Sequence, residues 1–486
     1  MKKTLFLLII FLSMKCASLD IHNSGLLGSE ENLLQTVIGC LFVPCGSAAT
    51  VPPATDPPVI PLPVGELDTS FGGTGYVTLD VAGFADQGWG VVTDSLDNII
   101  LAGNSSDGVS INQFIWKVNA DGGHETTFNS AGYSVTNYNY ASGSSIAYTA
   151  DDSFIVAGTV WNTTDDMAVW KYGQDGLFDF TFSVAGLASH DNATGAATAG
   201  SDMGNAVAID STGRIVVGGY SYNVVNLEDA AVWRYNSDGT LDATFNGVGF
   251  TVGDGVGGQT GSNDIITDLI IDNAGKIVFV GTTSDTGGNS VQFMMRMNQD
   301  GTIDTGFNLG APLVFQVNQA GGYFQGLGVN VIQAGDGSYF ISSAEVNTAN
   351  YLSTIKKISP DGTLDTTFQN SGILVLNAVT AVYVLDMEID AAGNLLLAGI
   401  IAEEDIASID GKVLVMRLLP DGSPDSAFGA GCPGYPSGCV YHNFSLGVAG
   451  FDAAASMVTD SQNRIILGGY TFGATTEMDA TIWRLR

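Results

Sequence analysis

The sequence predicts an all-β fold, a seven-bladed β-propeller of four-stranded antiparallel blades whose ring is closed by the N-terminal strand joining the last blade. Three observations support this prediction. A unit of about sixty residues recurs along most of the chain. Each unit holds short runs rich in β-branched residues together with an Asp-Gly hairpin signal. The two ends of the chain carry complementary parts of one further unit. A parallel solenoid is the alternative, but Asp-Gly hairpins require antiparallel neighbours.

The repeated unit is clearest between Trp233 and Phe245, where the chain reads WRYNSDGTLDATF. An apolar run and a basic residue precede Asp-Gly, and an acidic residue and a Phe follow it. A hairpin centred on Asp-Gly places the base and the acid opposite each other on its two arms. The aspartates of the Asp-Gly pairs are Asp121, Asp175, Asp238, Asp300, Asp361 and Asp421.

A cross-strand ion pair is therefore expected in each unit, worth a few tenths of a kcal/mol if exposed and more if shielded. The bases are Lys117, Lys171, Arg234, Arg296, Lys357, Arg417 and Arg484. The acids are Asp68, Glu125, Asp179, Asp242, Asp304, Asp365 and Asp425. Because the motif recurs in every unit, whereas catalysis is normally asymmetric, we interpret it as structural.

The unpaired members of these two columns predict how the ring closes. Asp68 has no base before it, and Arg484 has no acid after it. Joining the two ends of the chain would complete a seventh pair, as in a propeller whose last blade is finished by the N-terminal strand.

The other strands of each unit follow the same order. A short strand comes after the Phe, then an apolar strand that mostly ends in Asp, then a strand that ends in Gly. The glycine column is Gly103, Gly158, Gly219, Gly281, Gly399 and Gly469, and Ser343 interrupts it. After residue 65 we find no helical periodicity of useful length.

Strings such as DGTLDTTF, followed by IDAAGNLLLAG, resemble the delta-60 repeat proteins, a family of bacterial secreted or surface proteins of unassigned function. The resemblance covers residues 66–486. It departs from the family pattern at Glu125, which replaces Asp, around Tyr339, where the Gly is lost, and in long insertions. The resemblance implies a propeller and an extracytoplasmic location, and it implies no activity.

The charge balance limits the partners. The chain has 50 acidic and 16 basic residues, a net charge of -34 and a pI of about 4.1. Nucleic acid and anionic membrane surfaces are therefore excluded as partners. The basic residues lie almost entirely in the columns and in repeated turns, so no basic patch can form.

The N-terminus predicts export. Residues 1–16 have two lysines followed by an apolar run, which is typical of a bacterial secretory signal. Cys16 is the candidate for lipidation, which would make the protein a lipoprotein of the outer membrane or cell surface. Met14 and Lys15 depart from the lipoprotein pattern, and the alternative is cleavage near Ala17 or Ser18 with release as a secreted protein. Residues 17–65 form a Pro-rich leader or tether, and residues 66–486 form the propeller.

The five cysteines divide into Cys16 and two pairs. Neither pair has the partners of a zinc site, so we expect disulfides Cys40–Cys45 and Cys432–Cys439 in an oxidising compartment. The second would contribute about 2 to 3 kcal/mol on the chain-entropy model.

The candidate binding surface follows from the strand order. In an antiparallel blade the two tight turns share one face, and the two remaining connections share the other. We expect the long loops near Ser189, Asn223, Gly253, Ala402 and Gly429 on that second face, which marks it for binding. It would carry the aromatic residues Trp161, Tyr220, Tyr222, Tyr435, Tyr441, Tyr470 and Phe472.

These features predict a binding module for a glycan, a peptide or a surface protein, with membrane contact only through the lipid anchor. The alternatives are a hydrolase or lyase that uses loop carboxylates, and a structural envelope protein. Ordinary solvated loops would explain the aromatic residues equally well.

No cofactor is predicted. Calcium would suit Glu403–Asp405 or the pair Asp165 and Asp166, but neither has an EF-hand or nonapeptide spacing. The histidines His22, His124, His190 and His442 have no zinc-site spacing.

Overall fold

The computed structural model describes residues 64–81, 83–138, 140–195, 200–223, 227–258, 260–284, 290–316, 329–346, 351–376, 381–402, 411–444, 451–472 and 477–486. All of them belong to one compact unit, Ile60–Arg486. The predicted signal segment, the predicted Pro-rich leader up to residue 63 and the cysteines Cys16, Cys40 and Cys45 lie outside the described residues. Within these ranges the chain has no helix with the length and apolarity to cross a bilayer.

The described residues form seven four-stranded antiparallel sheets, which confirms the predicted propeller. Blade 1 comprises β2 (Asp86–Thr93), β3 (Ile99–Ser106), β4 (Ile111–Val118) and β5 (Tyr133–Val135). Blade 2 comprises β6 (Ala141–Tyr148), β7 (Phe154–Asn162), β8 (Thr164–Tyr172) and β9 (Leu187–His190). Blade 3 comprises β10 (Asp202–Ile209), β11 (Ile215–Tyr222), β12 (Glu228–Tyr235) and β13 (Phe250–Gly253). Blade 4 comprises β14 (Ile265–Ile271), β15 (Ile277–Ser284), β16 (Ser290–Met297) and β17 (Leu313–Gln316).

Blade 5 comprises β18 (Val331–Gln333), β19 (Tyr339–Val346), β20 (Tyr351–Ile358) and β21 (Ile373–Leu376). Blade 6 comprises β22 (Ala381–Ile389), β23 (Leu395–Ala402), β24 (Gly411–Leu418) and β25 (Cys439–His442). Blade 7 comprises β26 (Ala453–Thr459), β27 (Ile465–Phe472), β28 (Met478–Leu485) and, from the other end of the chain, β1 (Tyr76–Leu79). Two single 3-10 turns, Asn308–Gly310 and Phe368–Asn370, follow the Asp-Gly hairpins of blades 4 and 5.

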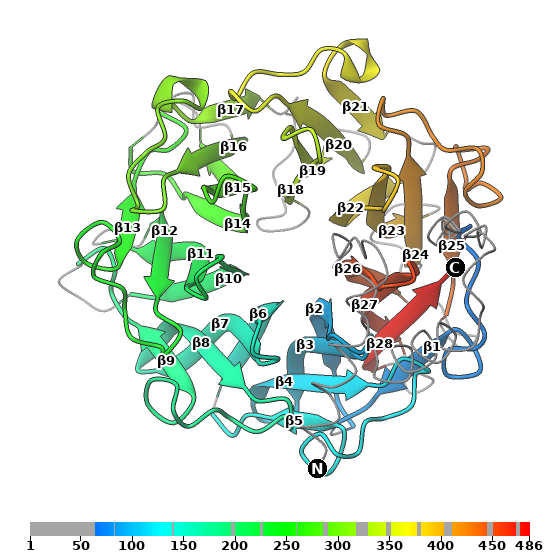
Figure 1. The fold of residues 1–486 in the computed structure, drawn as a ribbon, viewed down its shortest axis with the longest axis horizontal. Helices are drawn as coiled ribbons and strands as arrows, with labels where there is room; N and C mark the ends of the chain where they lie inside the picture. The colour runs from blue at the N-terminus through cyan, green and yellow to red at the C-terminus, as the bar shows by residue number, and fades with distance from the viewer. Residues whose placement is uncertain are drawn as a thin grey trace, which may run out of the picture. The chain divides into compact units, whose positions relative to one another are not determined.

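Each blade runs from an inner strand at the centre of the ring to an outer strand at the rim (Figure 1). Antiparallel order places the first connection of a blade and the connection that contains Asp-Gly on one side of the ring, which we call the turn face. The second connection and the link to the next blade lie on the other side, which we call the loop face.

The core lies between neighbouring blades, because each sheet is apolar on both faces. One cluster combines Ile100 and Ile115 of blade 1 with Ile146, Phe154 and Trp170 of blade 2, all of them buried. Such burial contributes roughly 25 cal/mol per Å² of apolar surface removed from water. A ring of blades therefore depends on every blade-to-blade contact for its core.

The glycine column has a packing cause. A methyl group built on Gly103 would overlap the carbonyl oxygen of Gln87 on the inner strand, and the same overlap occurs at every described glycine of the column. The inner strand bulges at this point, between Gly88 and Gly90 in blade 1. The glycine therefore lets the second strand approach the bulge of the first.

Closure occurs as predicted, because β1 pairs with β28 from Tyr76↔Trp483 to Leu79↔Ala480. The Asp68 N–H donates to the Arg484 carbonyl at 2.9 Å, which aligns the two ends of the chain beside the seventh ion pair.

The Asp-Gly hairpins join neighbouring blades. In blade 3 the hairpin is closed by a bridge between Tyr235 and Leu241, and the outer strand begins only at Phe250. The aspartate carbonyl of each hairpin accepts a hydrogen bond from the residue that follows the Phe of the preceding blade, at 2.6 to 3.2 Å. At the closing junction the Val64 carbonyl takes this role, accepting from Gly429 N–H at 3.0 Å. A turn that looks local in sequence is thus a contact between blades.

The base and acid columns meet on the turn face. Arg234–Asp242, Arg296–Asp304, Arg417–Asp425 and Arg484–Asp68 are ion pairs with closest nitrogen–oxygen distances of 2.7 to 2.9 Å. Lys171–Asp179 and Lys357–Asp365 are longer, at 3.3 Å each. Burial favours the protonated form of Asp242, but the hydrogen bonds from Thr244 and the Arg234 charge outweigh it and hold the pKa of Asp242 below its usual value.

Blade 1 departs from the predicted pairing. Lys117 pairs with Asp94 in the first turn of the blade, at 2.8 Å, and no Lys117–Glu125 ion pair occurs among the described residues. Glu125 instead accepts a hydrogen bond from Thr127 at 2.6 Å. The flexible Lys side chain reaches the more buried carboxylate, where a charge pair is less screened.

The arginines of the column also reach the next blade. The guanidinium of Arg234 stacks on Phe245 at 4.9 Å and donates to the carbonyl of Gln299, the residue before the next Asp-Gly. In the same way, the Arg296 guanidinium stacks on Phe307 and donates to the Pro360 carbonyl. The repeated motif is therefore a junction between blades, which explains why it recurs in every unit.

Candidate functional site

The loop face carries the long connections, with one correction. We expected the insertion between Gly429 and Phe444 on this face, but it joins β24 to β25 and therefore lies mainly on the turn face. The disulfide Cys432–Cys439 lies in this insertion. The expectation was wrong because the insertion follows Asp-Gly, and the third connection of an antiparallel blade ends on the same face as the first.

The predicted aromatic residues separate into two groups. Trp161, Tyr220, Tyr222 and Tyr470 lie at the loop-face ends of the second strands of their blades, and Phe472 joins them. Tyr435 lies on the turn face, packed beside the disulfide, and burial raises its pKa to about 12. Tyr441 lies in the outer strand β25, with the Lys412 ammonium 5.4 Å from its ring. Tyr435 is therefore separated from the loop-face group by its place on the turn face.

Among the described residues, His190, His442 and Asp166 are each engaged by side chains next to them. His190 packs against Phe250 in an outer strand, and His442 packs against Phe444. Burial lowers the pKa of both imidazoles. Asp166 accepts hydrogen bonds from Asn162 and Thr164, whereas Glu403–Asp405 lies outside the described residues. The neighbouring side chains therefore account for the positions of His190, His442 and Asp166.

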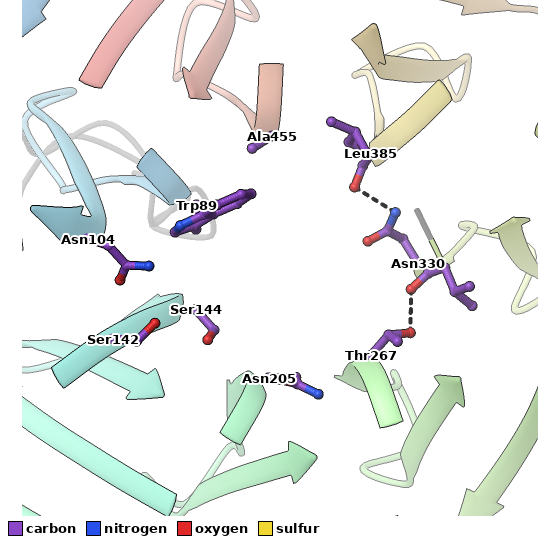
Figure 2. Close-up of a pocket in the computed structure, with 10 residues that line it drawn as sticks. Trp89, Asn104, Ser142, Ser144, Asn205, Thr267, Asn330, Leu385 and Ala455 are labelled. Atoms are coloured by element: carbon purple, nitrogen blue, oxygen red, sulfur yellow. Dashed lines mark hydrogen bonds between the residues drawn. The ribbon is translucent and has the colours of Figure 1, made fainter. Parts of the chain in front are cut away.

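A cavity of about 350 Å³ lies at the centre of the ring. It is lined by Trp89, Asn104, Ser142, Ser144, Asn205, Thr267, Val329, Asn330, Leu385 and Ala455. Figure 2 shows these side chains arranged around a common space, contributed by strands from around the ring. None of the lining residues is ionisable, so the cavity presents one indole ring and several neutral hydrogen-bonding groups.

The bulges of the inner strands direct residues into this cavity. The residues at the bulges are Trp89, Ser144, Asn205, Thr267, Leu385 and Ala455. All six line the cavity. Most of them lie in the half of the inner strand that is nearer to the loop face. The β-bulge that requires a glycine on the second strand therefore also directs the lining residues into the cavity.

Hydrogen bonds between neighbouring inner strands hold this lining in place. The Asn205 amide donates to the Ile266 carbonyl at 2.8 Å, and the Thr267 hydroxyl donates to the Val329 carbonyl at 2.8 Å. The Asn330 amide donates to the Leu385 carbonyl at 2.7 Å (Figure 2). These bonds cross from one blade to the next, so the cavity is rigid before any ligand enters.

Two partly buried carboxyls continue this ring of bonds. Asp268 accepts from Val331 N–H at 2.8 Å, and Asp386 accepts from Met457 N–H at 2.7 Å. Burial raises the pKa of Asp268 to about 7 and that of Asp386 to about 6. Glu388, two residues further along β22, has its pKa raised to about 7, chiefly by burial and further by the Asp386 charge. Blades 4 and 6 thus contribute these three carboxyls to their inner strands.

An aspartate at the start of the inner strand fixes the preceding loop in four blades. The carboxylates of Asp86, Asp202, Asp264 and Asp452 accept hydrogen bonds from the N–H groups of Val81, Asn192, Gly255 and Phe444, at 2.5 to 2.8 Å. Burial raises the pKa of the first three to about 6. Their role is to hold loops on the loop face, which accounts for the burial without invoking catalysis.

Three carboxylates meet at the loop face of blade 3. Oxygens of Asp229, Asp254 and Asp264 lie within 4.8 Å of one another, and Asp254 is exposed. Asp229 accepts a hydrogen bond from the Asn223 amide at 2.9 Å. Carboxylate oxygens suit calcium, but an acidic cluster held by amide donors does not by itself define a metal site.

The two faces differ in charge. The bases of the column lie near the turn face, and Arg214, Lys276 and Arg464 lie in its first turns. Among the described residues, Lys412 is the one base at the loop-face end of a strand, and it is buried. The carboxylates of the loop face therefore have no exposed cation beside them in the described part of the chain.

Sequence reasoning missed the residues of the cavity. The bulge residues Trp89, Asn205 and Thr267 differ in type from blade to blade, so no repeated column contains them. The signal that could have found them is their position, since the bulge lies opposite the glycine column of the neighbouring strand. Aligning the units on that column and asking which residue bulges would have selected them.

The repeats define a β-propeller repeat protein. A sequence family described as "Domain of unknown function (DUF5122) beta-propeller" matches residues 211–245 and 275–307, which are parts of blades 3 and 4. This match supports a propeller repeat family and assigns no activity. No curated relative matches the chain.

Several solved structures match the chain at low sequence identity. A catalytically inactive virginiamycin B lyase from Staphylococcus aureus, solved with quinupristin, is 9% identical, covers 84% of this chain and 98% of its own, and has a TM-score of 0.42. Drosophila Plexin A in complex with Semaphorin 1b is 9% identical over 87% of both chains, with a TM-score of 0.44. The polysaccharide lyase Uly1 is 9% identical, covers 82% of this chain and 90% of its own, and has a TM-score of 0.43. Similarity at this level carries no argument about function.

Proposed function

We propose that this protein is an extracytoplasmic β-propeller, lipid-anchored through Cys16, that acts as a binding module for a glycan, a peptide or a surface protein through its loop face. The central cavity carries the proposal. Its one aromatic ring and its neutral amide and hydroxyl groups match the chemistry of a glycan, whose apolar ring faces stack on indole while its hydroxyls exchange hydrogen bonds. A glycan is therefore the ligand that the cavity favours.

The preformed geometry supports this choice. The bonds that run from blade to blade hold Thr267 and Asn330 in place, so little side-chain freedom is lost on binding. Trp89 packs edge-on against Tyr470 at 5.8 Å, which places a residue of the predicted aromatic group directly behind the cavity.

The test is a glycan array probed with the full-length chain, the Trp89→Ala variant and the Trp161→Ala variant. Trp161 is a matched control, since it is an exposed loop-face tryptophan outside the cavity. We expect binding to a defined glycan class that Trp89→Ala abolishes and Trp161→Ala preserves. Absence of glycan binding, or binding that survives Trp89→Ala, would contradict a glycan site in the cavity.

The alternative is a hydrolase or lyase, and the raised pKa of Glu388 is the observation that favours it. A carboxyl that is protonated near neutral pH can serve as a general acid. If the protein is such an enzyme, the glycan found on the array should be cleaved on prolonged incubation. Glu388→Gln should then abolish product formation and preserve binding, whereas an intact glycan recovered from the parent protein would contradict this alternative.

A further inference from the structure

A group of exposed apolar side chains, which we call the apolar arc, lies on the loop face of blades 1 and 2. The exposed fractions are 44% for Phe84, 84% for Val109, 43% for Ile111, 51% for Tyr140 and 50% for Trp161. The other exposed large apolar residues of the described chain lie on the turn face or in outer strands. Exposed apolar side chains gathered in one place mark an interaction surface.

Contacts join the members of the arc across two blades. The Phe84 ring packs on Gly108, where an added methyl group would lie 2.6 Å from the ring. The Tyr140 hydroxyl donates to the Val109 carbonyl at 3.4 Å, and the Trp161 N–H donates to the Tyr140 carbonyl at 2.8 Å. The arc is therefore one connected surface, formed by the links that precede β2 and β6, by the β3–β4 connection and by the end of β7.

Carboxylates lie beside the arc at three places. Asp80 accepts from Gly83 N–H at 2.6 Å beside Phe84, and Asp107 accepts from Val109 N–H at 2.9 Å. Asp165 is the direct cross-strand partner of Trp161. The backbone hydrogen bonds to Asp107 hold its pKa below the usual value, so it is charged at neutral pH.

The arc has no cation of its own. The described bases of blades 1 and 2 are Lys117 and Lys171, which are engaged in ion pairs at the opposite ends of their strands. A partner that covers the arc must therefore bring apolar groups together with positive charge. Anionic membranes, nucleic acid and neutral glycans each lack one of these two properties.

We infer that the apolar arc is a docking surface for a basic polypeptide segment that carries both arginine or lysine and large apolar side chains. Its apolar side chains cover Phe84, Val109 and Trp161, and its cations face Asp107 and Asp165. The arc does not include the central cavity, so it adds a second ligand surface to the proposed binding module.

The test uses a short fluorescein-labelled synthetic peptide that contains both arginine and leucine, titrated with the full-length chain and followed by fluorescence anisotropy. Two control peptides replace all arginines by glutamine or all leucines by serine. We expect the peptide with both features to bind at least about tenfold more tightly than either control. Its binding should weaken as salt rises from about 0.1 M to about 1 M.

Protein variants locate the surface. Val109→Ser combined with Trp161→Ser should weaken binding about tenfold or more, and Asp107→Asn combined with Asp165→Asn should reduce the salt dependence. Phe180→Ser is the matched control, because Phe180 is 71% exposed on the turn face. Equal binding of the control peptide that lacks leucine, or loss of binding in Phe180→Ser, would overturn the inference.

Self-association of the parent protein that is abolished by Val109→Ser combined with Trp161→Ser would assign the arc to a second copy instead. Glycan binding that depends on Trp89 is unaffected by any of these outcomes, so the two proposals fail separately.

Discussion

Single carboxyls decide how adjacent inner strands meet. Asp268 and Asp386 each accept a backbone hydrogen bond from the following blade, and at the corresponding place in blade 5 the side chain is Asn330. An amide serves there without the cost of burying a charge. Glu388 does bear that cost, and its carboxylate accepts a hydrogen bond from the Ile389 N–H at 3.1 Å.

Glu388 therefore makes stability depend on pH. Its pKa is about 7 in the folded chain and 4.5 when unperturbed, so between these values the folded state holds a proton that the unfolded state has released. This contribution to stability falls as pH rises from about 4.5 to about 7. Glu388→Gln should be more stable than the parent at pH 8, on the order of 1 to 3 kcal/mol, and similar below pH 4.

Calorimetric melting temperatures across this pH range check the prediction. The exposed Glu66, whose side chain is 68% accessible, supplies the control variant Glu66→Gln, which should follow the parent at every pH. Parallel pH profiles for Glu388→Gln and the parent would contradict the predicted burial of the charge.

At the scale of elements, the Asp-Gly hairpin does more than reverse the chain. Gly239 has a φ of +82° and packs against Ser183 of the preceding blade, where an added methyl group would lie 2.8 Å from the Ser183 N and Cβ atoms. Gly213, in the first turn of blade 3, has a φ of +80° with no atom within 4 Å of such a methyl group. Comparing these two glycines therefore distinguishes the effect of backbone conformation, which they share, from the effect of contact between blades, which only Gly239 has.

Gly239→Ala should therefore destabilise the protein more than Gly213→Ala. Both substitutions cost about 1 kcal/mol through the left-handed conformation. Gly239→Ala should cost a further 1 to 3 kcal/mol, roughly, because the junction must shift to admit the methyl group. Urea unfolding followed by tryptophan fluorescence measures both. Equal losses would mean that the hairpin does not carry the junction.

At the scale of the whole molecule, the ring is closed by a pairing that spans the chain. Asp68 and Arg484 are 9% and 1% accessible, and Asp242 and Arg234 are 6% and 2% accessible. A second arginine lies 3.9 Å from each aspartate, Arg464 near Asp68 and Arg214 near Asp242. The closing junction and an internal junction are therefore matched in charge and burial.

Asp68→Lys and Asp242→Lys should destabilise the protein by similar amounts, about 3 to 5 kcal/mol, because each leaves buried positive charge without its partner. Thermal unfolding monitored by circular dichroism would show this as a similar drop for both variants. A loss confined to Asp242→Lys would show that the N-terminal strand is dispensable for the ring.

Much of the architecture could be predicted because its signals are local and repeated. The Asp-Gly pairs and the columns that contain Arg234 and Asp242 identify a turn in each unit, and the glycine column identifies the second strand, which the structure extends beyond the glycine instead of ending there. The odd members Asp68 and Arg484 then imply closure. Prediction was wrong where geometry between elements decides, as for Lys117, which pairs with Asp94, and for the Gly429–Phe444 insertion, whose face depends on the direction of the preceding strand.

The sequence by itself determined the blade count, the strand order and the closure of the ring, since each blade repeats the same hydrophobic pattern and turn chemistry. Only the tertiary structure decided the surfaces. The cavity combines Trp89 with Asn205 and Asn330 from different blades, and the apolar arc combines loops far apart in the chain. The cavity residues at the bulges recur once per unit but differ in type from blade to blade, so only the closed ring shows that they share one space.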